Sequence, residues 1–355
     1  MIDALVTFFL RQKLLAIAAI ALWIGLGIYS VFGLAVDSFP DVSNVQVQII
    51  TEPEAMPTEE VEMLVTFPIE NSLNGLPHIQ IVRSNSSFGL SVVTAIFDDT
   101  TDVYWARQIV QQRLTNVELP PEVPTPTLGP VISTFSNVLN YYITSSTRSL
   151  TDLRTIQDWQ IALRLKTING VANVVPYGGY EKEYQVYIRP VDLRSHGLTV
   201  KQVADAVAAN NENAGGKFIE LAGEEIIIRG VGRIQSIQDI GDIVLKSVDG
   251  TPVRVSQVAD VQIGAAFRRG AASLNGNEEA ITAMVFARKG ANSKVVVERV
   301  NHKLKEIQKN LPDDVKLHIY YDQANLVDRT IDTVREILTV SSGLVFTVLF
   351  ALLLK

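Results

Sequence analysis

Carboxylates are the first side chains in this sequence that could hold a cation. The stretch FDDTTD places Asp98, Asp99 and Asp102 within five positions, and carboxylate oxygens suit hard ions. The same acids also fit the end of a strand followed by the first turn of a helix, where the helix dipole favours negative charge. We expect them to have this structural role and not to form a cation site.

Nitrogen and thiolate ligands are scarce. The chain has no cysteine, which excludes disulfides, thiolate metal sites and cysteine nucleophiles. The four histidines are His78, His196, His302 and His318. No two of them have the spacing of a metal-binding motif, so we expect none to be a ligand, and His302 should be exposed on its helix.

Methionine thioethers are the remaining soft donors, and a soft ion such as Cu(I) would need several of them together. Met56 and Met63 stand seven residues apart around a predicted helix start, where we expect them to pack. Met284 lies in a predicted strand and could face a cleft. It is the one weak candidate for contact with a metal ion, and the sequence indicates no cofactor.

Composition indicates a chain attached to a membrane. Of the 355 residues, 47% are hydrophobic and 19% are charged, and the apolar excess lies at the two ends. The net charge is −7, with acidic and basic residues interspersed, so the chain lacks the basic patch of a protein that binds nucleic acid. The length allows two or three domains with cores of their own.

Two stretches without charge, residues 14–36 and 337–354, have the length of membrane spans. The first has 23 residues, enough to cross the ~30 Å core of a bilayer and more than the roughly 7–15 apolar residues of a cleaved signal peptide. Arg11 and Lys13 before it favour a cytoplasmic N-terminus, and a second crossing returns the C-terminus to the same side. Residues 37–336 would then stand outside the inner face.

The outer region opens with a strand, a helix, two strands and a helix. Apolar residues alternate in these strands and recur every three to four positions in the helices. This order is most of a split β-α-β unit. Pro68 should kink the first helix, and the proline-rich residues 118–130 read as a linker. The expected elements are a strand at 45–51, a helix at 57–74, strands at 79–84 and 90–98, and a helix at 102–117.

The same order then restarts, but an insertion at about 190–273 interrupts it. Asp322, after the last strand, has the position of a helix N-cap. The expected elements of this second unit are a strand at 139–144, a helix capped by Thr151 that ends near 166, strands at 171–176 and 184–189, and then a strand at 280–287, a helix at 292–310 and a strand at 315–321.

The insertion has folding signals of its own. Thr199 and Gln202 have the spacing of a capping box. The residues NENAGGKFIE followed by GEEIIIRG read as a glycine-tipped hairpin, and Asp249 with Gly250 reads as the turn of a second hairpin.

Four stretches carry a family resemblance: AVDSFPDVSNVQVQI, TEEVEMLVTFPIENSLNGLP, DVYWARQIVQQRL and KGANSKVVVERVNHKLKEIQKNLPDDVKLHIYYDQANLV. With the layout of span, strand–helix body and span, the chain resembles the N-terminal half of a resistance-nodulation-division (RND) efflux transporter of the heavy-metal branch. The resemblance covers essentially the whole chain. It implies a homotrimer, not an enzyme, in the inner membrane of a Gram-negative-type cell, where it exports cations by proton antiport.

The resemblance also implies partners and an assembly surface. The partners are a periplasmic membrane-fusion adaptor protein, an outer-membrane channel protein and membrane lipid. The two α/β units would be porter subdomains, and the insertion would belong to the docking domain. An assembly hairpin containing Asn213, Gly215, Gly216 and Phe218 would reach towards a neighbouring subunit.

The expected fold is therefore an α+β membrane protein. Two transmembrane helices flank repeated split β-α-β (ferredoxin-like) porter subdomains, with an inserted α/β docking domain. The expected divisions are an interfacial helix at 1–13, a transmembrane helix at 14–36, the first porter subdomain at 37–134, the second at 135–189 and 274–325, the docking insertion at 190–273, a connector at 326–336 and a second transmembrane helix at 337–354.

Neither expected span contains an acidic or basic residue, whereas antiport needs such groups within the membrane. The resemblance implies that these acids lie on later helices and that the main metal-binding residues lie in the C-terminal half, so we expect a truncated product that does not transport alone. Two alternatives remain. One is an RND exporter of drugs or lipids, which would need an aromatic-rich cleft although only 7% of the residues are aromatic. The other is a two-span membrane-anchored assembly protein or scaffold remnant.

Overall fold

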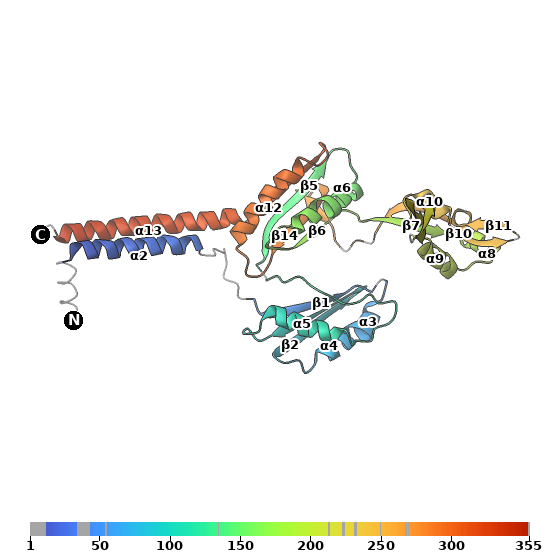
Figure 1. Cartoon of the computed structure of the whole chain (residues 1–355), viewed down its shortest axis with the longest axis horizontal. Coiled ribbons are helices and arrows are strands. Elements are labelled where there is room, and N and C mark those ends of the chain that lie inside the picture. Colours follow the sequence, from blue (N-terminus) through green and yellow to red (C-terminus); the bar gives the residue numbers. More distant parts are fainter. Residues whose placement is uncertain are drawn as a thin grey trace.

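The chain folds into two similar strand–helix units, an inserted segment and long helices at both ends (Figure 1). The structure is a computed structural model. It describes residues 12–33, 43–53, 55–133, 135–211, 214–221, 224–230, 233–248, 250–266, 268 and 270–353.

The first unit is an antiparallel sheet covered by helices. Its sheet order is β2-β3-β1-β4, and the central pair is in register through Val47 opposite Ala95 and Ile49 opposite Val93. The elements are β1 (Val45–Thr51), α3 (Thr58–Val61), η1 (Glu62–Thr66), α4 (Phe67–Leu73), β2 (Ile79–Ser87), β3 (Leu90–Phe97), α5 (Val103–Leu114) and β4 (Thr127–Leu128). The strands and helices expected here are confirmed, and the linker contributes the short edge strand β4.

Sequence periodicity explains how this unit packs. Strand β1 reads VQVQIIT and buries every second residue, because side chains alternate between the two faces of a strand. The helical segment 58–73 buries Val61, Val65, Ile69 and Leu73, which are four residues apart and share one face. Pro68 is the second residue of α4, which follows η1, a stretch of π-helix.

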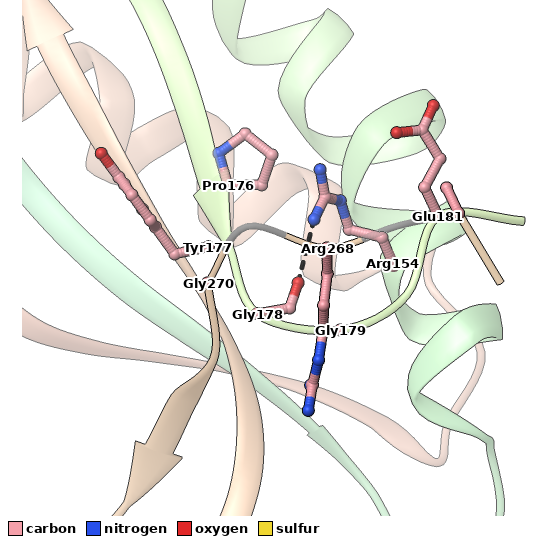
Figure 2. A pocket seen from close by; sticks show the side chains of 9 residues that line it. Arg154, Pro176, Tyr177, Gly178, Gly179, Glu181, Arg268 and Gly270 are labelled. Atoms are coloured by element: carbon pink, nitrogen blue, oxygen red, sulfur yellow. Dashed lines mark hydrogen bonds between the residues drawn. The ribbon is translucent and has the colours of Figure 1, made fainter. Parts of the chain in front are cut away.

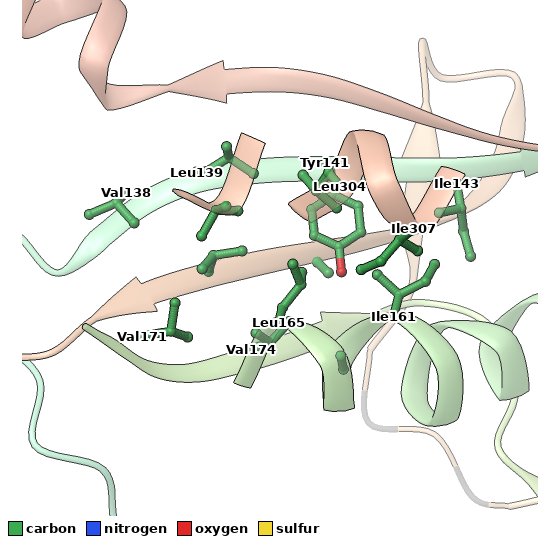
Figure 3. Packing of buried hydrophobic residues seen from close by; sticks show 14 of the residues in the cluster. Val138, Leu139, Tyr141, Ile143, Ile161, Leu165, Val171, Val174, Leu304 and Ile307 are labelled. Atoms are coloured by element: carbon green, nitrogen blue, oxygen red, sulfur yellow. The ribbon is translucent and has the colours of Figure 1, made fainter. Parts of the chain in front are cut away.

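The second unit repeats this topology. Strand β6 pairs with β14, and the order continues through β5 to β15, so β6-β14-β5-β15 corresponds to β2-β3-β1-β4. Figure 3 shows its core between the sheet and the helices, around Tyr141, Ile161 and Leu165. The elements are β5 (Asn137–Ser145), α6 (Leu150–Ile156), η2 (Gln157–Ala162), α7 (Leu163–Lys166), β6 (Val171–Tyr177), β13 (Ala272–Leu274), β14 (Glu278–Ala287), α12 (Ser293–Gln308) and β15 (Val315–Asp322).

Two caps in this unit test the sequence predictions. The predicted cap Thr151 is wrong: Ser149 caps α6, and its Oγ accepts a hydrogen bond from the Asp152 amide at 3.1 Å. Thr151 lies inside the helix, whereas Ser149 has the extended backbone that an N-cap needs. The cap at Asp322 is confirmed, since its Oδ1 accepts from the Ala324 amide at 2.9 Å.

The inserted segment forms its own small core. The capping box of Thr199 and Gln202 is confirmed at the start of α9, and the hairpin of β10 and β11 turns through Gly250. Asp249 lies outside the described residues. The elements are β7 (Lys182–Ile188), α8 (Pro190–Ser195), α9 (Val200–Ala209), β8 (Ala214–Leu221), β9 (Glu224–Gly230), α10 (Ile237–Gly241), β10 (Val244–Val248), β11 (Thr251–Arg254), α11 (Val255–Val258) and β12 (Ala259–Ala265).

Strand β7 differs from expectation in the sheet that it joins. The sequence placed it with the second unit, but it pairs with β12, from Lys182 opposite Ala265 to Ile188 opposite Ala259. The chain leaves the second sheet at Gly178 and Gly179, whose φ angles are +76° and +68°. Since such angles suit glycine, this pair turns the chain outward before β7 begins.

The predicted assembly hairpin exists as a paired backbone. Strands β8 and β9 are antiparallel, with Gly215 opposite Arg229 and Phe218 opposite Ile227. Gly216 lies between them in β8, where the register shifts. Asn213 lies outside the described residues.

The long helices α2 (Lys13–Gly33) and α13 (Gln323–Leu353) extend from the same side of the strand–helix body (Figure 1). The predicted connector at 326–336 and the predicted span after it form one continuous helix, α13. Among the described residues, α13 from Gln323 to Leu352 is the helix that is long and apolar enough to cross a membrane.

Candidate functional site

Met284, the predicted metal-contacting residue, lies on the face of the second sheet that points away from the helices. Its neighbours Ala283 and Val285 in β14 are buried in the core, so alternation turns Met284 outward together with Thr282 and Phe286. These three outward side chains are half-buried. The predicted strand at Met284 is confirmed, while its position at a cleft and a role in metal contact stay predictions.

Aromatic side chains flank Thr282, two residues before Met284 in the same strand. Tyr142 lies opposite Thr282 in the neighbouring strand, and its ring stacks on His318 with centroids 4.8 Å apart. The Tyr320 hydroxyl is 3.0 Å from the Thr282 Oγ1, which donates to the backbone carbonyl of Tyr141. Tyr177 lies opposite Thr282 on the other side. We call this surface the open sheet face: Tyr142, Tyr177, Thr282, Met284, Phe286, His318 and Tyr320.

Two amide side chains give the open sheet face unused polar atoms. Asn140 lies opposite Met284 and Asn137 lies opposite Phe286. The carboxamide oxygens of both asparagines are buried and have no hydrogen-bond partner among the described residues. Because a buried acceptor without a partner costs free energy, these oxygens favour a bound donor, cation or water.

Asp98 and Asp102, two of the three acids in the stretch FDDTTD, make structural hydrogen bonds. Asp102 caps α5 and accepts from the Trp105 amide at 2.8 Å, and Asp98 accepts from Gln80 at 2.8 Å. His302 lies on the outer side of α12 and is not part of the buried core. No group of three or more histidine or acidic side chains that could hold a metal ion occurs in the described part of the chain.

The other two methionines of the body behave differently from each other. Met56 packs against the core of the first unit, as expected. The packing expected for Met63 is wrong, because 65% of that residue is exposed. Met63 lies two residues from the buried Val61 and Val65, which places it on the opposite side of the helix.

A cavity of about 310 Å³ lies where the inserted segment leaves the second unit (Figure 2). Arg154 reaches into this junction and donates from Nη1 to the Gly178 carbonyl at 2.9 Å and from Nε to Asp158 at 2.7 Å. The Arg268 guanidinium lies 4.5 Å above the Tyr180 ring and 2.8 Å from Glu279. Since carboxylates pair with both arginines, the cavity is a structural junction rather than an open anion site.

Sequence reasoning missed most of the open sheet face. Thr282 and Phe286 share the strand of Met284 at a spacing of two, so the alternation could have found them. Tyr142 and Asn140 required the pairing of β5 with β14, which joins residues far apart in sequence. Tyr320 sits at a register shift of β15, which no local pattern marks.

The family model described as AcrB/AcrD/AcrF matches residues 5–355. The chain belongs to this family. The AcrB/AcrD/AcrF match therefore covers both units, the insertion and both long helices, and the expected kinship with RND transporters is confirmed.

Named relatives of this AcrB/AcrD/AcrF chain point to the heavy-metal branch. The cobalt-zinc-cadmium resistance protein CzcA of Cupriavidus metallidurans is 36% identical over 99% of this chain and 34% of its own length. Protein HelA of Legionella pneumophila is 39% identical over 99% of this chain and 34% of its own length. The cation efflux system protein CusA of Escherichia coli K12 is 40% identical over 86% of this chain and 30% of its own.

A solved structure supports the same kinship. A crystal structure of a heavy metal efflux pump superimposes with a TM-score of 0.83 at 33% identity, and the match covers 92% of this chain and 33% of the pump. The AcrB/AcrD/AcrF chain thus spans about a third of the length of the curated relatives that it matches.

Proposed function

We propose that this chain is part of an inner-membrane RND pump subunit that exports heavy-metal cations by proton antiport. The match of nearly the whole chain to a relative named as a cation efflux system protein carries this proposal. The duplicated units, each with sheet order corresponding to β2-β3-β1-β4 and helices on one face, support ferredoxin-like porter subdomains that move against each other in alternating access.

The proposed topology has two spans, within α2 and α13, with both termini in the cytoplasm and residues 37–336 in the periplasm. The uncharged stretch in each helix supports it, as does the projection of both helices from one side of the body (Figure 1). The inserted segment is proposed as the docking domain, with the hairpin of β8 and β9 reaching a neighbouring subunit of a homotrimer. A periplasmic adaptor and an outer-membrane channel would complete the assembly.

The open sheet face is the proposed route for the cation past this part of the pump. Met284 offers a thioether, which binds soft ions, and the oxygens of Asn137 and Asn140 lack partners among the described residues. These groups would supply weak, transient contacts, since transport requires that an ion also leaves. The chain alone would not transport, because residues 14–36 and 337–354 carry no acidic or basic side chain for proton coupling.

A chimera tests this proposal. Residues 5–355 would replace the matching third of CzcA from C. metallidurans, and zinc, cobalt and cadmium resistance would be measured together with flux into inverted vesicles under an imposed pH gradient. We expect proton-coupled cation flux in the chimera and none in vesicles that hold only the 355-residue chain. A chimera that assembles, as judged by its mass in detergent, but moves none of the three cations contradicts the proposal.

Point variants in the chimera test the route. Met284→Ala should lower cation flux, whereas Ile263→Ala, an exposed change on β12 in the insertion, should leave it unchanged. Equal flux in both variants would exclude Met284 from the cation path.

Export of aromatic or lipid-like compounds is a second candidate function. The open sheet face favours it, because Tyr142, Tyr177, Phe286 and Tyr320 concentrate aromatic rings there. The chimera distinguishes the two functions when cation resistance and dye efflux are measured side by side.

A further inference from the structure

A cavity of about 160 Å³ lies where four segments of the chain meet. Its wall is formed by the connection from the first unit, the turn after β14, and the first residues of α12 and α13. It shares no residue with the open sheet face, so it is separate from the proposed cation route. Its volume is several times the roughly 30 Å³ of one water molecule, which leaves room for a small polar ligand.

The wall of this cavity carries positive charge. Arg288 and Lys289 lie in it, and the described residues that line it include no aspartate or glutamate. The Lys289 Nζ donates to the Ser43 carbonyl at 2.9 Å, which fixes the position of this charge. The cavity at Arg154 and Arg268 differs, because carboxylates pair with both of those arginines. The charge of the wall therefore favours an anion.

The N-terminus of α12 adds to this preference. Ser293 is the first residue of this 16-residue helix and forms part of the wall. The first amides of a helix have no partner within the helix, and the helix dipole makes this end positive, so a bound anion is stabilised there. Gly290, in the turn before the helix, leaves open space beside it, since nothing lies within 4 Å of a Cβ added at this position.

Two serines in the connection from the first unit supply a hydroxyl donor. The hydroxyl oxygens of Ser133 and Ser136 are 3.2 Å apart, and the Ser136 Oγ also accepts from the Ser133 amide at 2.7 Å. A hydrogen bond between the two hydroxyls uses only one of their hydrogens. The other hydrogen is left to donate to an oxygen of a ligand in the cavity.

Gln323 is the buried polar side chain that distinguishes one anion from another. It is 3% exposed and forms part of the wall, and its Oε1 has no hydrogen-bond partner among the described residues. Because a buried acceptor without a partner costs free energy, this oxygen favours a ligand that donates a hydrogen bond. An anion that suits both Gln323 and the positive wall must therefore carry a proton of its own.

We propose that this cavity binds inorganic phosphate as the hydrogenphosphate ion. Its unprotonated oxygens accept from the Arg288 guanidinium, from the serine hydroxyl and from the first amides of α12, and its P–OH group donates to the Gln323 Oε1. Sulfate has the same shape but keeps no proton at neutral pH, so it would leave Gln323 unpaired. The phosphodiester of a lipid headgroup lacks this proton as well, which favours free phosphate as the ligand.

Equilibrium dialysis of the full chain in maltoside micelles tests the site, with radiolabelled phosphate at pH 7 in a buffer free of other oxyanions. One phosphate should bind per chain, and a large excess of sulfate should not displace it. A short-chain phosphatidylglycerol added to the micelles should not displace it either. Displacement by sulfate, displacement by the lipid, or a lack of saturable binding would each overturn the proposal.

Three variants assign the binding to this cavity. Arg288→Gln should weaken phosphate binding by about tenfold or more, because a charge-assisted hydrogen bond is lost. Gln323→Leu should bring the affinities for phosphate and sulfate close together, since the acceptor that distinguishes them is gone. Arg83→Gln is the matched control, because it removes the same charge from an exposed residue of β2 outside the cavity, and it should bind as the parent chain does. Equal affinities in the two arginine variants would overturn the proposal.

Melting temperatures separate loss of the site from loss of the fold. Arg288 is exposed, so Arg288→Gln should melt with the parent chain in phosphate-free buffer. Added phosphate should raise the melting temperature of the parent and of Arg83→Gln but not that of Arg288→Gln, since a ligand stabilises only a chain that binds it. An equal rise in all three chains would place the phosphate elsewhere and overturn the proposal. The sulfate competition on the parent chain tests the Gln323 contact without any substitution in the core.

Discussion

The Tyr141 hydroxyl donates a hydrogen bond to the Gln157 side chain across the interior of the second unit, over a distance of 3.0 Å. Both residues are fully buried, and burial raises the pKa of the Tyr141 phenol, so the hydroxyl stays protonated and can donate throughout the physiological range. The contact joins the middle of β5 to η2 and so links the sheet to the helix that presents Trp159.

Tyr141→Phe should lower the free energy of unfolding by about 1–3 kcal/mol, because it leaves the buried Gln157 oxygen without a donor. Urea unfolding of the chain in mixed micelles, followed by tryptophan fluorescence, measures this loss. The double variant Tyr141→Phe with Gln157→Leu should recover most of it, since both polar partners are then gone. A double variant that loses the sum of the two single effects would contradict this explanation.

Asp314 should make stability depend on acid pH. Its Oδ2 accepts from the Ser145 hydroxyl at 2.7 Å, from the Arg148 Nε at 2.9 Å and from the Thr147 hydroxyl at 2.9 Å. These bonds, led by that of Ser145, lower the pKa of Asp314 from 3.8 to about 2. A depressed carboxyl pKa stabilises the fold above pH 3.8, and this stabilisation is lost as the pH falls through about 2.

Asp314→Asn tests the acid dependence. Melting temperatures of the variant and the parent chain should differ at pH 6 and converge as the pH approaches 2. A constant difference across that range would mean that the carboxylate charge is not what Ser145, Thr147 and Arg148 recognise.

Gly178→Ala should destabilise the junction with the inserted segment. A Cβ at this position would lie 2.3 Å from the Ala280 carbonyl oxygen, and the φ of +76° is already unfavourable for alanine. Gly75→Ala is the matched control, because Gly75 has a φ of +75° and nothing within 4 Å of an added Cβ. The control should cost about 1–2 kcal/mol from the backbone alone, and Gly178→Ala should cost more. Unfolding midpoints and limited proteolysis at the junction measure the loss of stability in each variant. Equal losses would show that the backbone near Ala280 moves away from the added Cβ without a cost in stability.

Local patterns predicted the elements of this fold well, and its pairings less well. The alternation of β1 and the four-residue spacing of Val61, Val65 and Ile69 located a strand and a helix, because both signals are written in neighbouring residues. Strand β7 also carried a strand pattern. Its partner β12 lies far along the chain, and no local sequence pattern indicates that these two strands pair.

Residue type alone does not indicate which side of the second helical segment is buried. A polar residue, Gln157, is buried, while Trp159 is exposed, which reverses the usual preference of each residue type. Spacing gives the better signal, because Gln157 and Ile161 are four residues apart and buried, and Trp159 lies two residues from each, on the opposite side of the helix. Met63 has the same relation to Val61 and Val65.

The inserted segment occupies the place where the first unit has only the tight turn between β2 and β3. Its two ends leave the second sheet as adjacent strands, with Lys182 beside Ala265. The two ends of the segment therefore lie next to each other in space. A short turn could replace the segment without a change in the strand order of either sheet. A different segment with neighbouring ends could be inserted at the matching loop of the first unit, between β2 and β3. Apart from this one long connection, the two units have the same order of strands and helices.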